Sequence, residues 1–227
     1  SLSSAGGELY ENIYTYSLND KKVTKENVSD IIAEISREIG AEDVFVFYYA
    51  GHGIMVENQK ETNDFFLVMS DVTNLYGGKE MLKDKGISSA ELLTYSKNIA
   101  AQKQVFFLDA CQSGAALEAF ATRGVTREKA IAQLARSTGT FFITASQDIE
   151  YANEASSIEH GLFTYAILEI LSGKVEHITS STVSIGTLKS YVEQRVPELA
   201  EQYKTSTQYP TGYSFGNDFP IGVLDPK

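Results

Sequence analysis

A short apolar run that ends in polar residues and glycine is the feature that most limits how this chain can fold. Residues 105–108 (VFFL) are consecutively apolar, and residues 109–114 (DACQSG) follow them directly. An apolar run without alternation is typical of a strand that is buried on both faces of a parallel sheet. Such a strand needs helices on both sides of its sheet, so the run favours an α/β fold.

A second stretch follows the same pattern. Residues 43–50 (DVFVFYYA) are largely apolar, and Gly51-His52-Gly53 comes next. Because ligands bind beyond the carboxyl ends of the strands in open α/β sheets, we expect His52 and Cys111 at one edge of the sheet. Side chains along an extended segment repeat every second residue, so Asp109 should point the same way as Cys111. A thiol, an imidazole and a carboxylate are therefore expected to face one cleft, where the imidazole could help form the thiolate.

These two strand ends resemble those of the caspase-fold cysteine peptidases (peptidase C14). Caspases have a Gln-Ala-Cys motif before a turn that ends in glycine, with a histidine about 50 residues upstream. Here 111 − 52 = 59 residues separate Cys111 from His52. YYAGHG at 48–53 and DACQSG at 109–114 are most similar to the bacterial caspase-like, or metacaspase-related, branch. The similarity continues through most of the chain, in 144–148 (TASQD), 160–168 (HGLFTYAIL), 208–210 (QYP) and 218–222 (DFPIG).

The resemblance implies covalent hydrolysis of peptide bonds. His52 would act as the general base and acid, and Cys111 as the nucleophile that forms an acyl-enzyme. The backbone N–H groups of Gly53 and Cys111 would form the oxyanion hole. This chemistry requires no cofactor. Metacaspase relatives often need calcium, but the sequence shows no ligand spacing that would support a calcium site.

One departure from the caspase pattern bears on specificity. Caspases have glutamine two residues before the cysteine, as part of a pocket for aspartate, whereas this chain has Asp109. By resemblance, Asp109 would bind a basic side chain before the scissile bond, and Asp148 matches a second acidic position. Two carboxylates fit the fork of a guanidinium better than an ammonium, so we expect cleavage after arginine in preference to lysine. Caspase-like enzymes are often cut between the catalytic cysteine and the next strand, and Arg123 is the most plausible self-cleavage site here. The alternative, that the basic residues in this stretch only solvate a helix face, stays open.

Composition limits the other functions. The 227 residues include one cysteine and have a formal net charge of −11. An acidic chain without a lysine and arginine cluster is not expected to bind nucleic acid. No stretch approaches the roughly 20 apolar residues that would span a membrane, and a single cysteine excludes an internal disulfide, so a cytoplasmic location is expected. The length suits one caspase-like peptidase domain over 1–227.

The remaining periodicities predict strands alternating with helices, which indicates a mainly parallel three-layer α/β sheet flanked by helices. Strands are expected at 8–18, 65–69 and 140–145. Helices are expected after Thr24, after Ser88 (a capping box with Glu91), within 115–137, at 162–171 and at 185–203, the last interrupted by Pro197. Residues 57–63 and 74–85 are expected to be loops, and residues 208–223 irregular with one short strand.

The family topology also predicts that this chain lacks a strand. In caspase-like folds a first strand and helix precede the segment that 8–18 resembles, and that first strand lies between this segment and the strand before His52. The domain is therefore expected to be N-terminally incomplete. Unpaired backbone groups in the middle of a sheet are costly, so we expect another chain or an upstream segment to supply the strand.

Other functions stay open at this stage. A lone cysteine is most often a small buried hydrophobic residue, although the polar and glycine residues around Cys111 argue against that here. The chain could also be a catalytically silent caspase-like interaction module, or a thiol hydrolase that acts on a small acyl substrate. His160 and His177 are interpreted as hydrogen-bonded or solvent-facing histidines without a catalytic role.

Overall fold

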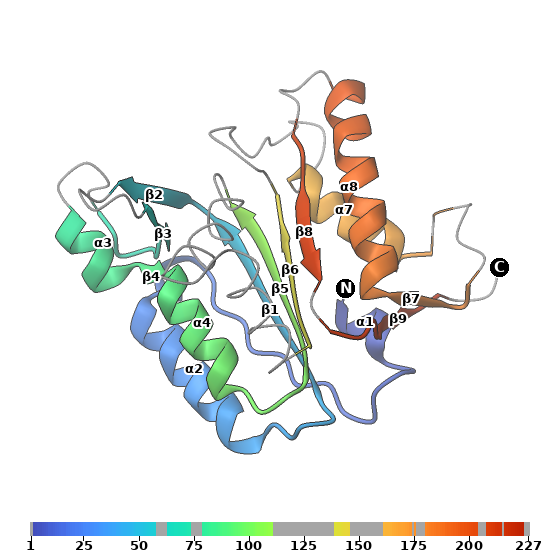
Figure 1. Ribbon diagram of the computed structural model, residues 1–227, viewed down its shortest axis with the longest axis horizontal. Coiled ribbons are helices and arrows are strands. Elements are labelled where there is room, and N and C mark those ends of the chain that lie inside the picture. The colour runs from blue at the N-terminus through green and yellow to red at the C-terminus, as the bar shows by residue number, and fades with distance from the viewer. Residues whose placement is uncertain are drawn as a thin grey trace.

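The main sheet of the computed structural model has four strands in the order β1-β5-β6-β8 (Figure 1). The strands are β1 (Val44–Gly51), β5 (Lys103–Ala110), β6 (Gly139–Thr144) and β8 (Thr211–Ser214). β1, β5 and β6 run parallel, and β8 is antiparallel to β6. The structure describes residues 2–57, 63–73, 79–110, 139–145, 161–173, 175, 180–203, 208–214 and 216–224. The prediction of a mainly parallel sheet is confirmed.

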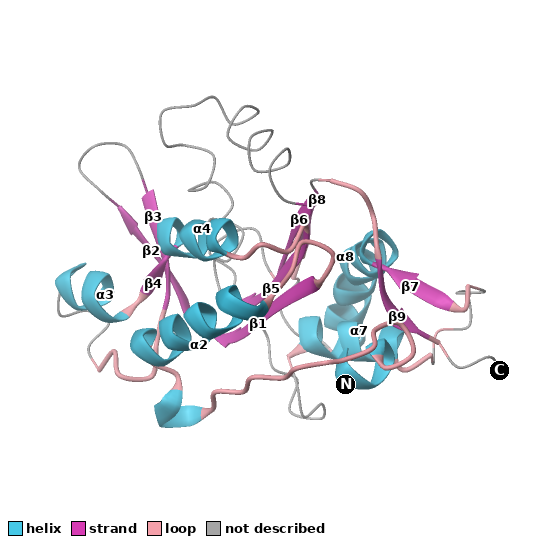
Figure 2. Ribbon diagram, turned by 90° about the horizontal axis from the view of Figure 1, so that it is seen from below, coloured by secondary structure: helices cyan, strands magenta, loops and turns pink. Residues whose placement is uncertain are grey.

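Helices cover both faces of this sheet, which confirms the three layers (Figure 2). On one side lie α2 (Lys25–Glu38) and α4 (Ser89–Asn98), and on the other lie α7 (Leu162–Leu171) and α8 (Ile185–Gln202). Each face has its own apolar cluster. The α7/α8 cluster includes Val105 and Phe107, whereas the α2/α4 cluster includes Phe106 and Leu108. Alternate residues of β5 therefore enter the two cores, as the period of two along a strand requires.

Smaller elements complete the described chain. Three antiparallel strands, β2 (Gly53–Glu57), β3 (Asn63–Leu67) and β4 (Ile87–Ser88), form a second sheet. A two-stranded sheet joins β7 (Thr182–Ser184) to β9 (Pro220–Val223), and the short helices are α1 (Leu2–Gly6), the 3-10 turn η1 (Asp20–Lys22) and α3 (Lys79–Lys85). β2 begins one residue after His52, so the second sheet is attached directly to the carboxyl end of β1.

Local sequence signals explain several helix boundaries. Thr24 caps α2, accepting a hydrogen bond from the backbone N–H of Asn27 at 3.3 Å. Ser88 and Glu91 form the predicted capping box at the start of α4. Gly173, with φ of 70°, follows α7 in the left-handed conformation that glycine tolerates best.

The strand predicted at 8–18 is wrong, because these residues form turns and an irregular extended segment in the structure. A strand exists only through its hydrogen-bonded neighbour, and this segment pairs with none of the described strands. Ile13 and Tyr14 consequently remain 41% and 76% exposed. β1 is likewise an edge strand among the described residues, with Tyr48 42% exposed. The supply of a further strand stays a prediction.

Three other expectations also need correction. The expected loop at 74–85 contains α3, because Leu82 is buried at 3% exposure against the second sheet. Pro197 lies inside a continuous α8 rather than interrupting it, and its neighbours Val196 and Leu199 are buried in the core. The expected irregular tail contains two strands, β8 and β9, since each finds an antiparallel partner. These are cases in which tertiary packing overrides a local signal.

Candidate active site

The carboxyl ends of β1 and β5 lie side by side, as the sequence predicted. Their parallel ladder pairs Ala50 with Asp109 and ends on the pair Gly51 and Ala110. His52 follows β1 directly, and its side chain is exposed to solvent. Neighbouring strands are about 4.8 Å apart, so residues that follow these strand ends start within side-chain reach of one another. Cys111 lies outside the described residues.

The backbone around His52 is held by a tyrosine and by the second sheet. The His52 carbonyl accepts hydrogen bonds from the backbone N–H of Val68 at 2.9 Å and from the Tyr49 hydroxyl at 3.0 Å. The Tyr49 hydroxyl also lies 2.8 Å from the Val68 carbonyl. Burial raises the pKa of Tyr49, so its hydroxyl stays protonated as a donor. The turn that presents His52 is thus fixed to β3 and its continuation.

Close packing favours glycine at the residue before His52. A Cβ at Gly51 would lie 2.5 Å from the Tyr49 hydroxyl oxygen, which is shorter than any normal contact. Gly53 is buried and pairs with Leu67 in the second sheet. Gly51 therefore allows the close approach of the Tyr49 hydroxyl, and Gly53 continues the chain directly into the second sheet.

Asp109 is a buried carboxylate on the α7 side of the sheet. Its side chain is 8% exposed, and its neighbours Leu108 and Ala110 point to the opposite core. The hydroxyl of Thr164 donates a short hydrogen bond to Asp109 Oδ2. A Cβ at Gly161 would lie 3.2 Å from the same oxygen, so the absence of a side chain at that residue gives the carboxylate its space. Asp109 is thus fitted closely against the first turn of α7.

The position beside α7 favours a negative charge on Asp109. Gly161 is the N-cap of α7, and Thr164 is the third residue of the helix. The amino end of a helix has a partial positive charge from its unpaired N–H groups, which stabilises an adjacent carboxylate. A charged, buried and oriented carboxylate at a strand end is suited to binding a cation.

Tyr48 extends this contact from the adjacent strand. Its hydroxyl lies 2.7 Å from Thr164 Oγ1. Burial raises the pKa of Tyr48, the charge of Asp109 raises it further, and the hydrogen bond with Thr164 partly opposes both. Sequence reasoning assigned no role to Tyr48 or Thr164. The available signal was their place in YYAGHG and HGLFTYAIL, the two stretches that resemble the caspase-like family.

Gln208 lies near the same edge of the sheet. β8 pairs antiparallel with β6 through Thr211 and Thr144, so the residues just before β8 lie beyond the carboxyl end of β6. Gln208 is 1% exposed, and its Oε1 has no hydrogen-bond partner among the residues that the structure describes. Its proximity to the site could not be inferred from the QYP motif alone.

Several predicted residues fall outside the described part of the chain. These are Cys111, Asp148, the expected self-cleavage site Arg123, and the two remaining histidines, His160 and His177. The structure brings Asp109 and the His52 turn to one edge, and the roles of the other residues stay predictions. Among the described residues, no group of three or more metal-ligating side chains could hold a metal ion. No described helix is long and apolar enough to cross a bilayer.

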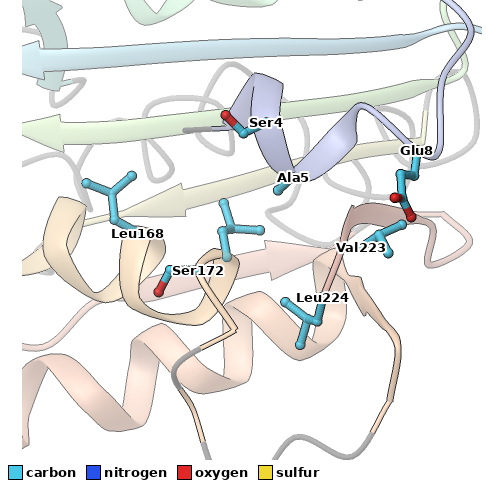
Figure 3. Close-up of a pocket in the computed structure, with 8 residues that line it drawn as sticks. Ser4, Ala5, Glu8, Leu168, Ser172, Val223 and Leu224 are labelled. Atoms are coloured by element: carbon cyan, nitrogen blue, oxygen red, sulfur yellow. The ribbon is translucent and has the colours of Figure 1, made fainter. Parts of the chain in front are cut away.

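A cavity of about 240 Å³ lies at the other end of α7 (Figure 3). Figure 3 shows residues that line it, among them Leu168 of α7, Ser172 just after that helix, Ala5 of α1, and Glu8 and Leu224. Eight residues of helix separate Thr164 from Ser172, which corresponds to roughly 12 Å at 1.5 Å per residue. This cavity is therefore separate from the Asp109 edge, and its lining includes no thiol or imidazole.

Comparison with known proteins identifies the family. The family model of the caspase domain, peptidase C14, matches residues 8–218. The chain therefore belongs to the caspase-domain family.

A solved structure supports the fold. The chain resembles protein GSU0716 from Geobacter sulfurreducens, with a TM-score of 0.59 and 16% sequence identity over 92% of this chain and 83% of that one. At this identity the likeness concerns the fold alone. None of the curated proteins matches the chain.

Proposed function

We propose that this protein is a cysteine endopeptidase that uses Cys111 and His52 as its catalytic dyad. The observation that supports the dyad best is the register of β1 and β5, whose last pair is Gly51 and Ala110. The next residue on each strand is a member of the dyad. Membership of the caspase-domain family supports the same chemistry.

In the proposed mechanism His52 takes the proton of the Cys111 thiol. The thiolate attacks the scissile carbonyl, and the backbone N–H groups of Gly53 and Cys111 stabilise the oxyanion. His52 then protonates the leaving amine, which leaves an acyl-enzyme on the sulfur. Water, activated by the imidazole, hydrolyses this thioester and releases the thiol. The hydrogen bonds from the Tyr49 hydroxyl and the Val68 N–H to the His52 carbonyl would keep the imidazole near one position through both steps.

The proposed substrates are proteins or peptides with a basic residue before the scissile bond, arginine in preference to lysine. The buried carboxylate of Asp109 supports this preference, because it would repel an aspartate and attract a cation. Asp148 is the proposed second carboxylate. Two carboxylates would bind a guanidinium by paired hydrogen bonds that an ammonium cannot reproduce. The chemistry needs no cofactor, and we propose a cytoplasmic location and self-cleavage after Arg123.

A digest of a peptide library by the purified protein tests this function. We expect cleavage after arginine and, more slowly, after lysine, and no cleavage by the Cys111→Ala or His52→Ala proteins, which should retain the wild-type fold. Turnover by pure Cys111→Ala protein would contradict the dyad. Cleavage after aspartate would contradict the specificity. A wild-type protein that cleaves no peptide, although a small electrophile labels Cys111, would favour a thiol hydrolase with a small acyl substrate.

A further inference from the structure

Two hydroxyl groups from distant parts of the chain are linked in series to Asp109. Thr164 lies 55 residues after Asp109 in the sequence and donates a hydrogen bond to its Oδ2. Tyr48 lies 116 residues before Thr164 and reaches its Oγ1 at 2.7 Å. The three side chains therefore form a chain of hydrogen bonds that joins β1, α7 and β5.

Counting protons fixes the direction of this chain. A threonine hydroxyl has one proton, and an ionised carboxylate can only accept hydrogen bonds. If Thr164 donates its proton to Asp109, its oxygen must accept the bond from Tyr48. Tyr48 therefore donates to Thr164, and Thr164 donates to Asp109. Each donor polarises the next, so Tyr48 strengthens the bond that holds the carboxylate.

The packing around Asp109 leaves little freedom for another arrangement. Its carboxylate lies between the backbone of Gly161 and the Thr164 hydroxyl, and its side chain is 8% exposed. Without the Thr164 hydroxyl, a buried oxygen would lose a donor, and the carboxylate would gain the freedom to rotate or to take up a proton. Either change would weaken its attraction for a cation.

We propose that Tyr48 and Thr164 are positioning residues for substrate specificity, because together they orient Asp109 and keep it ionised to bind the basic side chain of the substrate. This inference rests on the proposed function of Asp109. It adds two residues that act through Asp109 and need not touch the substrate. Removing either hydroxyl should weaken binding of the basic side chain and leave the reaction of Cys111 unaffected.

The test compares matched variants in peptide cleavage. Thr164→Val retains the shape of the side chain, and we expect it to raise the KM for arginyl peptides roughly 10- to 100-fold, with kcat changed less than about threefold. Tyr48→Phe removes a neutral hydrogen bond and should raise the KM about 3- to 10-fold. Thr164→Ser should restore most of the wild-type KM. Alkylation of Cys111 by iodoacetamide should proceed at the wild-type rate in all three proteins.

Control variants separate this role from general stability. Thr94→Val removes another helical threonine hydroxyl, on α4, and Tyr14→Phe alters an exposed tyrosine. Both should leave the KM unchanged. In the Asp109→Asn protein, adding Thr164→Val should have little further effect, because the two residues act as one unit. A Thr164→Val enzyme with the wild-type KM for arginyl peptides would overturn the proposal, as would an equal loss in Thr94→Val.

The proposal can also fail independently of the peptidase assignment. If the wild-type protein cleaves no peptide, the proposed function is wrong, and the positioning role is then judged by binding of acetyl-arginine amide to the Cys111→Ala protein. Weaker binding after adding Thr164→Val, by roughly 10-fold or more, supports the role. Equal binding by the two proteins, or no measurable binding by either, overturns it.

Discussion

Strand β5 has two buried polar side chains, Gln104 and Asp109, which face opposite sides of the sheet and differ in their hydrogen-bond partners. Gln104, near the start of the strand, is fully buried against the α4 side. Its Oε1 accepts from the Ser96 hydroxyl at 2.8 Å, and its Nε2 donates to three backbone carbonyls, those of Ser96, Ile99 and Ala101. Asp109, near the end of the strand, faces α7 and is bonded by Thr164.

The two side chains differ in charge and in the origin of their partners. The partners of Gln104 lie within eight residues of it in the chain, so this neutral amide fastens α4 and its following turn to β5. Asp109 draws on residues from β1 and α7, which are distant in sequence. A buried neutral group with saturated local bonds is suited to stability, whereas a buried charge fixed by distant groups is suited to recognition. The comparison predicts that mutations at the two positions will have separate effects.

Asp109→Asn should produce the largest effect. It removes the charge that attracts the substrate cation while retaining the size of the side chain. We expect kcat/KM for arginyl peptides to fall by about 100-fold or more, with alkylation of Cys111 unchanged. Steady-state kinetics and the rate of alkylation by iodoacetamide measure the two properties, and Asp30→Asn on the exposed surface of α2 is the control. If the variant cleaves after arginine as well as the wild type does, the assignment of Asp109 is wrong.

Gln104→Leu should have the opposite profile. The substitution leaves three buried carbonyls without their common donor, so we expect the free energy of unfolding to fall by about 3 kcal/mol. The preference for arginine over lysine should not change, because Gln104 faces the other core. Urea denaturation measures the loss, and Gln102→Leu, at an exposed position two residues earlier, is the control. A change in specificity without a loss of stability would show that Gln104 does not differ from Asp109 in the way proposed.

Tyr49→Phe should distinguish positioning of the catalytic base from binding of the substrate. It removes the hydroxyl that donates to the His52 and Val68 carbonyls. We expect kcat to fall by about tenfold, with KM for arginyl peptides nearly constant and stability reduced by about 1 kcal/mol. Tyr49→Phe should therefore change mainly kcat, whereas Thr164→Val should change mainly KM. An unchanged kcat would show that the hydrogen bond from the Tyr49 hydroxyl does not determine the position of His52.

The smallest expected effect concerns Glu169, a carboxylate on α7, the helix that contacts Asp109. Arg195 holds the pKa of Glu169 below its ordinary value through hydrogen bonds at 2.8 and 3.1 Å, and Tyr191 adds another. A lowered pKa in the folded state stabilises the protein above the ordinary pKa, and this stabilisation is lost as pH falls through the folded value. The pair is partly exposed, so it should contribute no more than about 1 kcal/mol.

Urea denaturation between neutral pH and pH 3 measures this contribution. Arg195→Met should be less stable than the wild type at neutral pH, and the difference should shrink as Glu169 becomes protonated. Specificity should be unaffected, unlike the effect of Asp109→Asn. A difference that stays constant down to pH 3 would mean that the Glu169 charge does not contribute.

The part of the fold that the sequence predicted well is the part specified by neighbours along the chain. The apolar runs before His52 and Cys111 predicted β1 and β5, and the capping box of Ser88 and Glu91 predicted the start of α4. The apolar run before Asp109 predicted a strand end there, and β5 ends one residue later, at Ala110. The prediction that Asp109 and Cys111 point the same way stays a prediction. Alternation and capping act over a few residues, so sequence alone can reveal them.

The predictions that were wrong concerned elements that depend on partners elsewhere in the chain. The segment at 8–18 has strand-forming residues, but a strand also needs a neighbour to pair with, and the sequence of one segment cannot supply that information. Pro197 was expected to interrupt α8, whereas packing of the surrounding turns maintains one helix. In both cases tertiary contacts decided between alternatives that local preference left close in free energy.

The sequence by itself determined the strand ends, the residues that follow them and the family to which they point. Only the tertiary structure decided how Asp109 is held, because Thr164 bonds it from α7 and Tyr48 bonds Thr164 from 116 residues earlier in the chain. Separation along the sequence does not reveal such contacts, because a hydrogen bond requires two atoms to lie within a few ångströms of each other in the folded chain. The folded sheet and the α7 helix turn three residues that are separate in the sequence into one hydrogen-bonded unit.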